Sequence, residues 1–250
     1  MIPPIFDLTG KKALVTGSSR GIGKSIAMLL GQAGAKVVFH ASRPSNKLDA
    51  AQEEAEQQGI LCTSVTADLS DEEEVCGLIR KTGDVDLLIL NASMQKYVTL
   101  EEFDTQEFAQ EFNTNVRSSF QLIQAFLPGM TARRFGRIVT IGSVNQWKQS
   151  PRLSIYASTK SAQVNLMMNC ARSYAKYGIT ANNIAPGVIA TDRNKEALDD
   201  PQMAQNILKL IPAGRFGTPD DCAGLVLLLC SGAGSYMTGC DIPVAGGMQL

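Results

Sequence analysis

Short apolar runs of strand length alternate with longer segments of helical period along nearly the whole chain. Since parallel strands need a long crossover between them, this alternation predicts a parallel sheet whose crossover helices cover both faces. We therefore expect an α/β fold, a single doubly wound Rossmann-type domain over residues 1–250 with a seven-stranded parallel sheet. The expected strands cover residues 12–16, 36–40, 60–66, 85–90, 137–141, 180–184 and 240–244.

The segments between these strands carry helix signals of their own. Ser70 and Glu73 have the spacing of a capping box that opens one helix. Residues 188–217 differ, because they show no strand pattern and place prolines and glycines around short helical pieces. A long connection in a compact domain is usually functional, so a substrate lid is expected here, with an ordinary surface insertion as the alternative. The other expected helices cover residues 21–33, 46–58, 105–127, 156–177 and 219–230.

A glycine-rich loop follows the first expected strand and opens the first helix. Its glycines have the spacing G-x-x-x-G-x-G, and glycine lets a backbone come close to a pyrophosphate. The start of the helix adds free N–H groups and a partial positive charge. The loop is therefore expected to bind the phosphates of a dinucleotide. Its candidate contacts are Gly17, Ser19, Arg20, Gly21, Ile22 and Gly23.

The end of the second expected strand indicates which dinucleotide is bound. An acid there would bind the ribose hydroxyls of NAD, but no acid lies between Ala35 and Leu48. Arg43 and Arg20 are both placed to approach a 2′-phosphate, to which arginine gives paired, charge-assisted hydrogen bonds. The sequence therefore favours NADP(H) as the cofactor, with NAD(H) still open and with a merely solvated Arg43 as the alternative.

Tyr156 and Lys160 stand one helical turn apart, and Ser143 precedes them at the end of a strand. Holding a phenolate near neutral pH requires the pKa of a tyrosine to fall by about three units, and an adjacent ammonium favours that change. Such a trio can move a proton beside a carbonyl group. Ser143, Tyr156 and Lys160 are therefore the candidate catalytic residues.

Composition limits the other classes of function. The chain has a net charge of -1, with 44% hydrophobic and 19% charged residues, so no nucleic-acid partner is expected. His40 is the only histidine, which excludes a multi-histidine zinc site. A Ser-His-Asp triad would have to use His40 as its base. No metal site is expected. Residues 1–10 lack the features of a signal peptide, and no apolar run has the length of a membrane span, so a cytoplasmic protein is expected.

The glycine loop, the order of the strands and the set of Ser143, Tyr156 and Lys160 resemble the short-chain dehydrogenase/reductase family over nearly the whole chain. Two motifs depart from that family, because Leu90-Asn91-Ala92-Ser93 replaces Asn-Asn-Ala-Gly and Val244-Ala245-Gly246-Gly247 replaces Val-Asp-Gly-Gly. Other residues match family positions: Asp68 and Leu69 at the adenine, Asn91 and Ala92 in the first motif, Asn115 at a proton-relay water, and Pro186, Gly187, Ile189 and Thr191 at the nicotinamide.

The resemblance implies an oxidoreductase that interconverts a ketone and a secondary alcohol. In it, Ser143 would bond the carbonyl oxygen and Tyr156 would exchange the proton. Lys160 would hold the nicotinamide ribose and lower the pKa of Tyr156, so that Tyr156 and Lys160 are cofactor contacts as well. The resemblance also implies a homotetramer that pairs the two long helices, residues 105–127 and 156–177.

The substrate is left open by the sequence, as are the direction of the reaction and the pathway. Residues 140–144 and 211–217 resemble 3-oxoacyl-acyl-carrier-protein reductases, and Arg134 and Arg172 resemble the arginines on which such enzymes dock the carrier protein. The alternative is a sugar, sugar-acid or polyol dehydrogenase that uses NAD(P). A more remote alternative is a protein that binds the nucleotide without catalysis.

Overall fold

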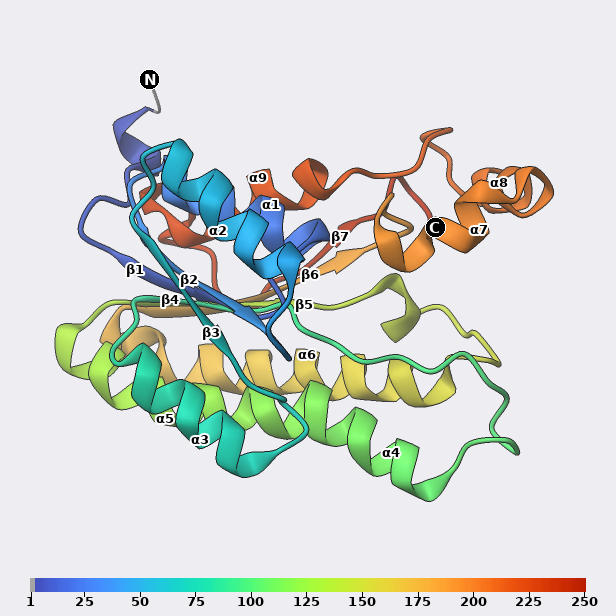
Figure 1. Ribbon diagram of the computed structural model, residues 1–250, viewed down its shortest axis with the longest axis horizontal. Helices are drawn as coiled ribbons and strands as arrows, with labels where there is room; N and C mark the ends of the chain where they lie inside the picture. The colour runs from blue at the N-terminus through green and yellow to red at the C-terminus, as the bar shows by residue number, and fades with distance from the viewer. Residues whose placement is uncertain (1–2) are drawn as a thin grey trace.

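The computed structural model describes residues 3–250 and contains one parallel sheet in the order β3-β2-β1-β4-β5-β6-β7 (Figure 1). The predicted doubly wound fold with seven parallel strands is confirmed. The strands are β1 (Lys12–Val15), β2 (Lys36–Ala41), β3 (Cys62–Thr66), β4 (Leu87–Leu90), β5 (Gly136–Ile141), β6 (Ile179–Pro186) and β7 (Asp241–Val244).

Helices cover both faces of the sheet (Figure 1). The upper face carries α1 (Gly21–Gln32), α2 (Asn46–Gln57) and α9 (Pro219–Cys230), and the lower face carries α3 (Glu72–Thr82), α4 (Thr105–Phe112), α5 (Ser118–Arg133) and α6 (Ser154–Tyr174). Short 3-10 turns lie at η1 (Pro4–Phe6), η3 (Val144–Gln146), η4 (Ala175–Tyr177), η5 (Asp192–Asn194) and η6 (Gly232–Gly234). Because helices cover the sheet on both sides, the central strand β4 is apolar throughout, and every one of its residues is buried.

The position of the functional cleft follows from the strand order. From β1 the chain proceeds to β2 and β3 on one side of the sheet and then returns to β4 on the other side. The crossover helices therefore diverge at this point, and the carboxyl ends of β1 and β4 open onto a crevice between them. Residues that follow these two strands are thus brought together although 75 positions separate Asn91 from Thr16.

The start of α3 differs from the prediction. The N-cap of this helix is Asp71, whose carboxylate accepts hydrogen bonds from the backbone N–H groups of Glu73 and Glu74 at 2.8 and 3.1 Å. The predicted cap, Ser70, instead donates its hydroxyl to Asp68 at 2.7 Å. The predicted capping box is wrong because a carboxylate one residue nearer the helix is the better acceptor for two amides.

The helix predicted over residues 105–127 is interrupted and longer. A π-helical turn, η2 (Asn113–Arg117), separates α4 from α5, and α5 continues to Arg133 with Pro128 inside it. A π turn adds one residue to the helical repeat and thereby redirects the side chains that follow. Here it lets Asn115 point to the segment after β4, to which it hydrogen-bonds.

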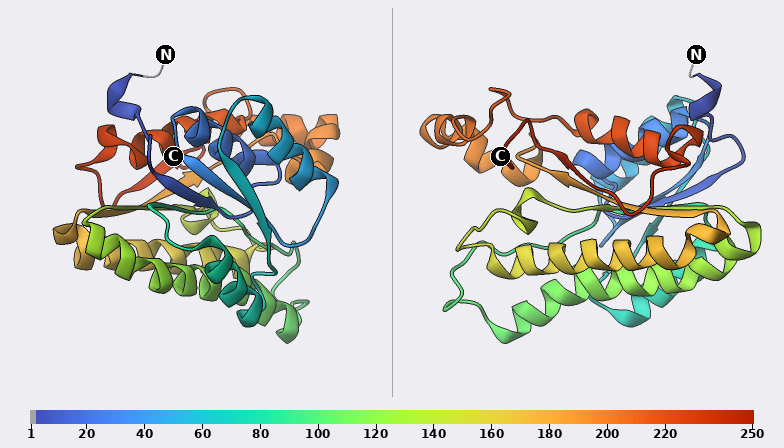
Figure 2. Two further views of the ribbon diagram at one scale, coloured as in Figure 1. Left: turned by 60° about the vertical axis from the view of Figure 1, so that its left-hand side comes forward. Right: turned by 180° about the vertical axis from the view of Figure 1, so that it is seen from behind.

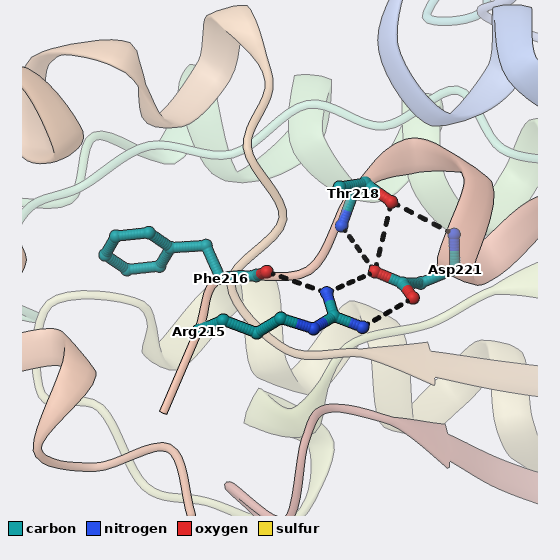
Figure 3. A network of polar contacts seen from close by, with 4 residues as sticks. All are labelled: Arg215, Phe216, Thr218 and Asp221. Carbon is teal, nitrogen blue, oxygen red and sulfur yellow. Dashed lines mark hydrogen bonds and ion pairs between the residues drawn. The ribbon is translucent and has the colours of Figure 1, made fainter. Parts of the chain in front are cut away.

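Residues 188–217, which were predicted to form a substrate lid and are called the lid segment below, contain η5, α7 (Lys195–Asp199) and α8 (Pro201–Leu208), of which α8 lies farthest from the sheet (Figure 1). Its two ends pair with each other through a bridge between Ile189 and Gly217. Near the end of this segment, Arg215 donates to both carboxylate oxygens of Asp221 at 2.8 Å. The backbone N–H of Thr218 donates to the same carboxylate at 2.7 Å (Figure 3). Arg215 thus joins the lid segment to α9, and it holds the pKa of Asp221 well below its usual range.

Candidate active site

The glycine loop has the backbone geometry that a phosphate site requires. Gly17 and Gly21 have φ angles of 63° and 57°, in the left-handed region that favours glycine. A Cβ atom at Gly17 would lie 2.9 Å from the backbone of Ala92, so the close approach also demands glycine. In the described part of the chain, no side chain caps the N-terminus of α1, whose N-cap is Arg20. The first amides of α1 are therefore free for an anion, and the loop fits a pyrophosphate.

Asn91 locks this loop to the end of β4. Its side-chain amide donates to the carbonyl oxygens of Thr16 and Gly17 at 2.8 and 2.9 Å. The hydroxyl of Thr16 in turn accepts the backbone N–H groups of Asn91 and Ala92 at 2.9 and 3.0 Å. The two residues of the altered motif thus position the glycine loop, and Ser93 follows them at the mouth of the cleft.

His40, at the end of β2, lies under the same loop and was not predicted to act there. The backbone N–H of Gly17 donates to Nδ1 of His40 at 3.0 Å, so Nε2 carries the proton and donates to the carbonyl oxygen of Ala67 at 3.0 Å. The backbone of His40 also exchanges hydrogen bonds with Ser18, at 2.9 and 2.8 Å. The adjacency of β1 and β2 in a parallel sheet was the signal that could have revealed this contact.

Protonation of His40 should weaken the fold and the loop together. Burial lowers the pKa of His40 to about 4, from an ordinary value of 6.5. Because the folded state holds the neutral ring, stability is fully present above pH 6.5 and is lost as the pH falls from 6.5 to 4. The pKa difference corresponds to about 3 kcal/mol. Chemical denaturation across this pH range should show that the free energy of unfolding falls less with pH in a His40→Asn variant than in wild type. The same pH dependence in both proteins would show that His40 does not cause the loss of stability.

The residues that were predicted to contact the adenosine half of the cofactor include one arginine without a partner in the described part of the chain and one in an ion pair. Arg43 is exposed, and among residues 3–250 no hydrogen bond or ion pair to its side chain is found. Arg20 and Lys47 both pair with Asp192 of the lid segment, at 3.2 and 2.5 Å. The sequence did not single out Lys47, although its place in the first turn of the helix after β2 could have done so. Asp68 accepts hydrogen bonds from the backbone and hydroxyl of Ser70, and the neighbouring Leu69 is buried.

The segment that was predicted to contact nicotinamide begins at the end of β6. Pro186 is the last residue of β6, and the backbone N–H of Gly187 donates to Val244 at 3.0 Å. Ile189 is buried. The side chain of Thr191 comes so close to the glycine loop that a Cβ atom at Gly21 would lie 3.3 Å from it. The structure thus places Thr191 beside the glycine loop, while Pro186, Gly187 and Ile189 precede it in the same segment.

Ser143, Tyr156 and Lys160 come together at the carboxyl end of β5. Ser143 is the second residue after the end of β5, and Tyr156 and Lys160 lie on adjacent turns of α6. All three side chains are buried. The Nζ atom of Lys160 lies 5.5 Å from the centre of the Tyr156 ring and donates to Ile141 and Gln163 at 2.8 and 2.9 Å. A carbonyl group in this place would meet hydroxyl donors beside a buried amine.

The electrostatics of the pair differ from the expectation that Lys160 lowers the pKa of Tyr156. Burial raises the pKa of Tyr156 above its ordinary value, while the charge of Arg193 and hydrogen bonding to Ser143 and Ser93 oppose that rise. Burial also lowers the pKa of Lys160 to about 7, and Arg193 adds to this. Desolvation is the largest cause of the pKa shift in both groups. Tyr156 therefore keeps its proton at neutral pH, the state that a proton donor needs.

Asn115 is fully buried and holds the segment after β4 in place. Its side chain accepts from the backbone N–H of Met94 at 2.8 Å and donates to the carbonyl of Met94 at 2.9 Å. It also donates to the hydroxyl of Thr159, the neighbour of Lys160, at 3.0 Å. The side chain therefore joins the wall of the cleft to the catalytic helix.

Three groups at this end were not predicted from the sequence as site residues. Arg193 of the lid segment hydrogen-bonds Ser93, and Glu111 of α4 is fully buried with its Oε2 accepting the backbone N–H of Lys96 at 3.3 Å. Burial raises the pKa of Glu111 to about 7. Ser93 was noted only as a departure from a motif, and nothing in the local pattern marks an exposed arginine or a helical glutamate as part of a site.

Two negative findings concern residues 3–250 alone. None of their helices combines the length and the apolar character that crossing a membrane would require. No three side chains of the types His, Cys, Asp and Glu gather there as a metal site would need.

One end of the cleft suits a dinucleotide and the other suits proton transfer to a carbonyl group, which together define a dinucleotide-dependent oxidoreductase. The family model of short chain dehydrogenases matches residues 11–202. The chain therefore belongs to the short-chain dehydrogenase family, and the family and enzyme class predicted from the sequence are confirmed.

Individual relatives extend over almost the full chain. The sequence is 35% identical to gluconate 5-dehydrogenase of Gluconobacter oxydans, with 99% of this chain and 98% of that protein covered. It is also 35% identical to a 3-oxoacyl-[acyl-carrier-protein] reductase of Staphylococcus aureus, with 96% and 98% covered. The fold matches a 3-oxoacyl (acyl-carrier-protein) reductase from Agrobacterium tumefaciens, solved with NADP bound, at a TM-score of 0.93 and 39% identity, with 97% and 96% covered.

Proposed function

We propose that this protein is an NADP(H)-dependent oxidoreductase that interconverts a ketone and a secondary alcohol. The observation that carries the proposal is the meeting of Ser143, Tyr156 and Lys160, all buried, at the carboxyl edge of the sheet beside a loop that fits a pyrophosphate. Ser143 would donate to the carbonyl oxygen, and Tyr156, which keeps its proton, would protonate that oxygen during reduction. The bound nicotinamide would supply or accept the hydride.

Consumption of NADPH with a panel of ketones tests this proposal. The panel should hold 3-oxoacyl thioesters, keto forms of sugar acids and keto forms of polyols, each at several concentrations. Activity with at least one class is expected. A protein that binds NADPH but reduces none of them, and oxidises none of the matching alcohols, would instead be a nucleotide-binding protein without catalysis.

The preference for NADP(H) is tested by Arg43→Ala. Arg43 is exposed next to the end of β2, where a 2′-phosphate would meet it, and the charge-assisted bonds at stake are worth about 1.5–3 kcal/mol. We expect NADPH binding to weaken roughly 10- to 150-fold while NADH binding stays nearly constant. Fluorescence titration with both nucleotides measures this. Equal losses for both would mean that Arg43 does not contact the phosphate.

Two substrate classes have support. For a 3-oxoacyl thioester carried by an acyl-carrier protein, the support is the Staphylococcus relative and two exposed arginines, Arg134 at the end of α5 and Arg172 on α6. For a sugar acid or polyol, it is the Gluconobacter relative at the same identity. If the carrier protein is the partner, changing Arg134 and Arg172 to Glu should slow the reduction of the protein-bound substrate and leave the reduction of a small thioester unchanged.

We further propose that the protein is a homotetramer. The adjacent helices α5 and α6 lie side by side on the lower face (Figure 2). An apolar groove of about 620 Å³ is lined by residues of these two helices. Phe120, Leu127 and Leu166 are among its lining residues, and Phe120 is 47% exposed. An exposed phenylalanine on such a groove suits the pairing of these helices with those of a second copy.

Light scattering should accordingly give the mass of four chains at micromolar concentration. Phe120→Lys places a charge in the groove and should shift the population toward smaller species. Leu100→Lys is the control, because Leu100 is 62% exposed and is not among the residues that line the groove, and it should leave the mass unchanged. A monomeric mass for the wild-type chain would refute the proposal.

A further inference from the structure

Arg193 extends from the lid segment to Ser93, the residue that follows Asn91 and Ala92 at the end of β4. Its Nη1 donates to the hydroxyl of Ser93 at 3.0 Å, and its Nη2 donates to the carbonyl oxygen of Ser93 at 2.7 Å. A guanidinium has five N–H donors, so others are left for a ligand. Among residues 3–250 Arg193 takes part in no ion pair. Its hydrogen-bond partners are therefore both neutral atoms of Ser93.

Ser93 is fixed on both sides, so the position of Arg193 is defined. On one side the backbone N–H of Ala92 donates to the hydroxyl of Thr16 at 3.0 Å. On the other side Met94 exchanges two hydrogen bonds with the buried amide of Asn115, at 2.8 and 2.9 Å. Arg193 thus rests on a rigid part of the cleft wall, although it comes from the lid segment, and the lid is held at that wall by this contact.

The place where Arg193 rests is next to the catalytic pair. The hydroxyl of Ser93 and the charge of Arg193 both lower the pKa of Tyr156, and the same charge lowers the pKa of Lys160. The nearby acid is Glu111, whose Oε1 has no hydrogen-bond partner in the described part of the chain. Glu111 is fully buried, and in the described part of the chain it forms no ion pair with the exposed Arg193. The guanidinium is therefore left without an acidic partner among these residues.

We propose that Arg193, braced on Ser93, recognises a carboxylate of the substrate, so that the enzyme acts on keto acids and hydroxy acids whose carboxylate lies a few bonds from the reacting carbon. A planar guanidinium binds a carboxylate through two parallel hydrogen bonds, which also orients the rest of the substrate. A 3-oxoacyl thioester has no negative charge at that distance. The inference rests on the proposed function and selects the sugar-acid class within it.

Matched acids and esters separate charge recognition from every other effect. The probes are acetoacetate and levulinate, each beside its methyl ester, and the readout is kcat/KM for NADPH-dependent reduction. Wild type should prefer the acids, and Arg193→Met should lower the acid-to-ester ratio roughly 10- to 150-fold. The acid-to-ester ratio of Arg193→Lys should lie between those of wild type and Arg193→Met, because lysine keeps the charge but cannot form the two parallel hydrogen bonds. Ser93→Ala should move the ratio in the same direction by less.

Lys195→Met is the control. It removes one positive charge from the same lid segment, but the ammonium of Lys195 pairs with Asp199 at 2.6 Å and is exposed. The acid-to-ester ratio should stay at the wild-type value in this variant. An equal fall in Lys195→Met and Arg193→Met would show general attraction rather than recognition and would overturn the inference.

Two further outcomes overturn it in different ways. If Arg193→Met slows acids and esters equally, Arg193 only holds the lid and does not recognise charge, while the proposed function stands. If the wild type reduces no ketone of any class although it binds NADPH, the proposed function fails and the inference fails with it. A ratio that falls in Arg193→Met alone supports the inference.

Discussion

Tyr156→Phe should lower turnover at least ~100-fold and leave the affinity for NADPH within a few-fold of wild type. The substitution keeps the buried ring and removes only the hydroxyl, which is the group that the fold presents beside Ser143 and Lys160. Because the pKa of Tyr156 lies above its ordinary value, the wild-type hydroxyl carries its proton at neutral pH. Its loss leaves the reacting oxygen without that proton donor. Steady-state kinetics with the best ketone of the panel measures the effect.

Tyr177→Phe is the matched control, since Tyr177 lies beyond the opposite end of α6 and contacts Tyr174 rather than the cleft. Its turnover should equal that of wild type. Near wild-type turnover in Tyr156→Phe would remove Tyr156 from the mechanism. A large fall in both variants would indicate damage to α6, and thermal unfolding of the two proteins distinguishes that case.

Gly23→Val should weaken NADPH binding at least ~100-fold. Even a Cβ atom at Gly23 would lie 2.4 Å from the side-chain amide of Asn91 and 2.4 Å from the carbonyl oxygen of Gly17. Those are the two ends of the hydrogen bond that locks the glycine loop to β4. Relief of the overlap must move backbone, which costs about 3 kcal/mol, the upper part of the range for overpacking. Fluorescence titration with NADPH gives the change in affinity.

The control for this variant is Gly224→Val, on the exposed face of α9. Among the described residues nothing lies within 4 Å of the position that a Cβ atom would occupy there. A valine at Gly224 should therefore leave NADPH binding at the wild-type value and change the free energy of unfolding by no more than about 1 kcal/mol. Equal NADPH affinity in both variants would show that the close packing around Gly23 is not needed by the loop.

The sequence by itself determined the sheet and both ends of the cleft. Short apolar runs located all seven strands, because burial on both faces favours apolar residues in a strand, and the helical period located the main helices. Gly17 and Gly23 were identifiable because their role depends on local backbone geometry and on order along the chain. The pair of Tyr156 and Lys160 was identifiable because one turn of a helix fixes its spacing.

Tertiary structure alone decided the contacts between segments that are distant in the sequence. His40 supports Gly17 across 23 positions, and Arg193 reaches Ser93 across 100. No local pattern contains these pairs, because they arise from the order of the strands in the sheet and from the packing of the lid segment against the residues that follow β4. The ionisation of Tyr156 was also decided there: the sequence led us to expect that Lys160 lowers the pKa, whereas desolvation, which only a packed core creates, raises it.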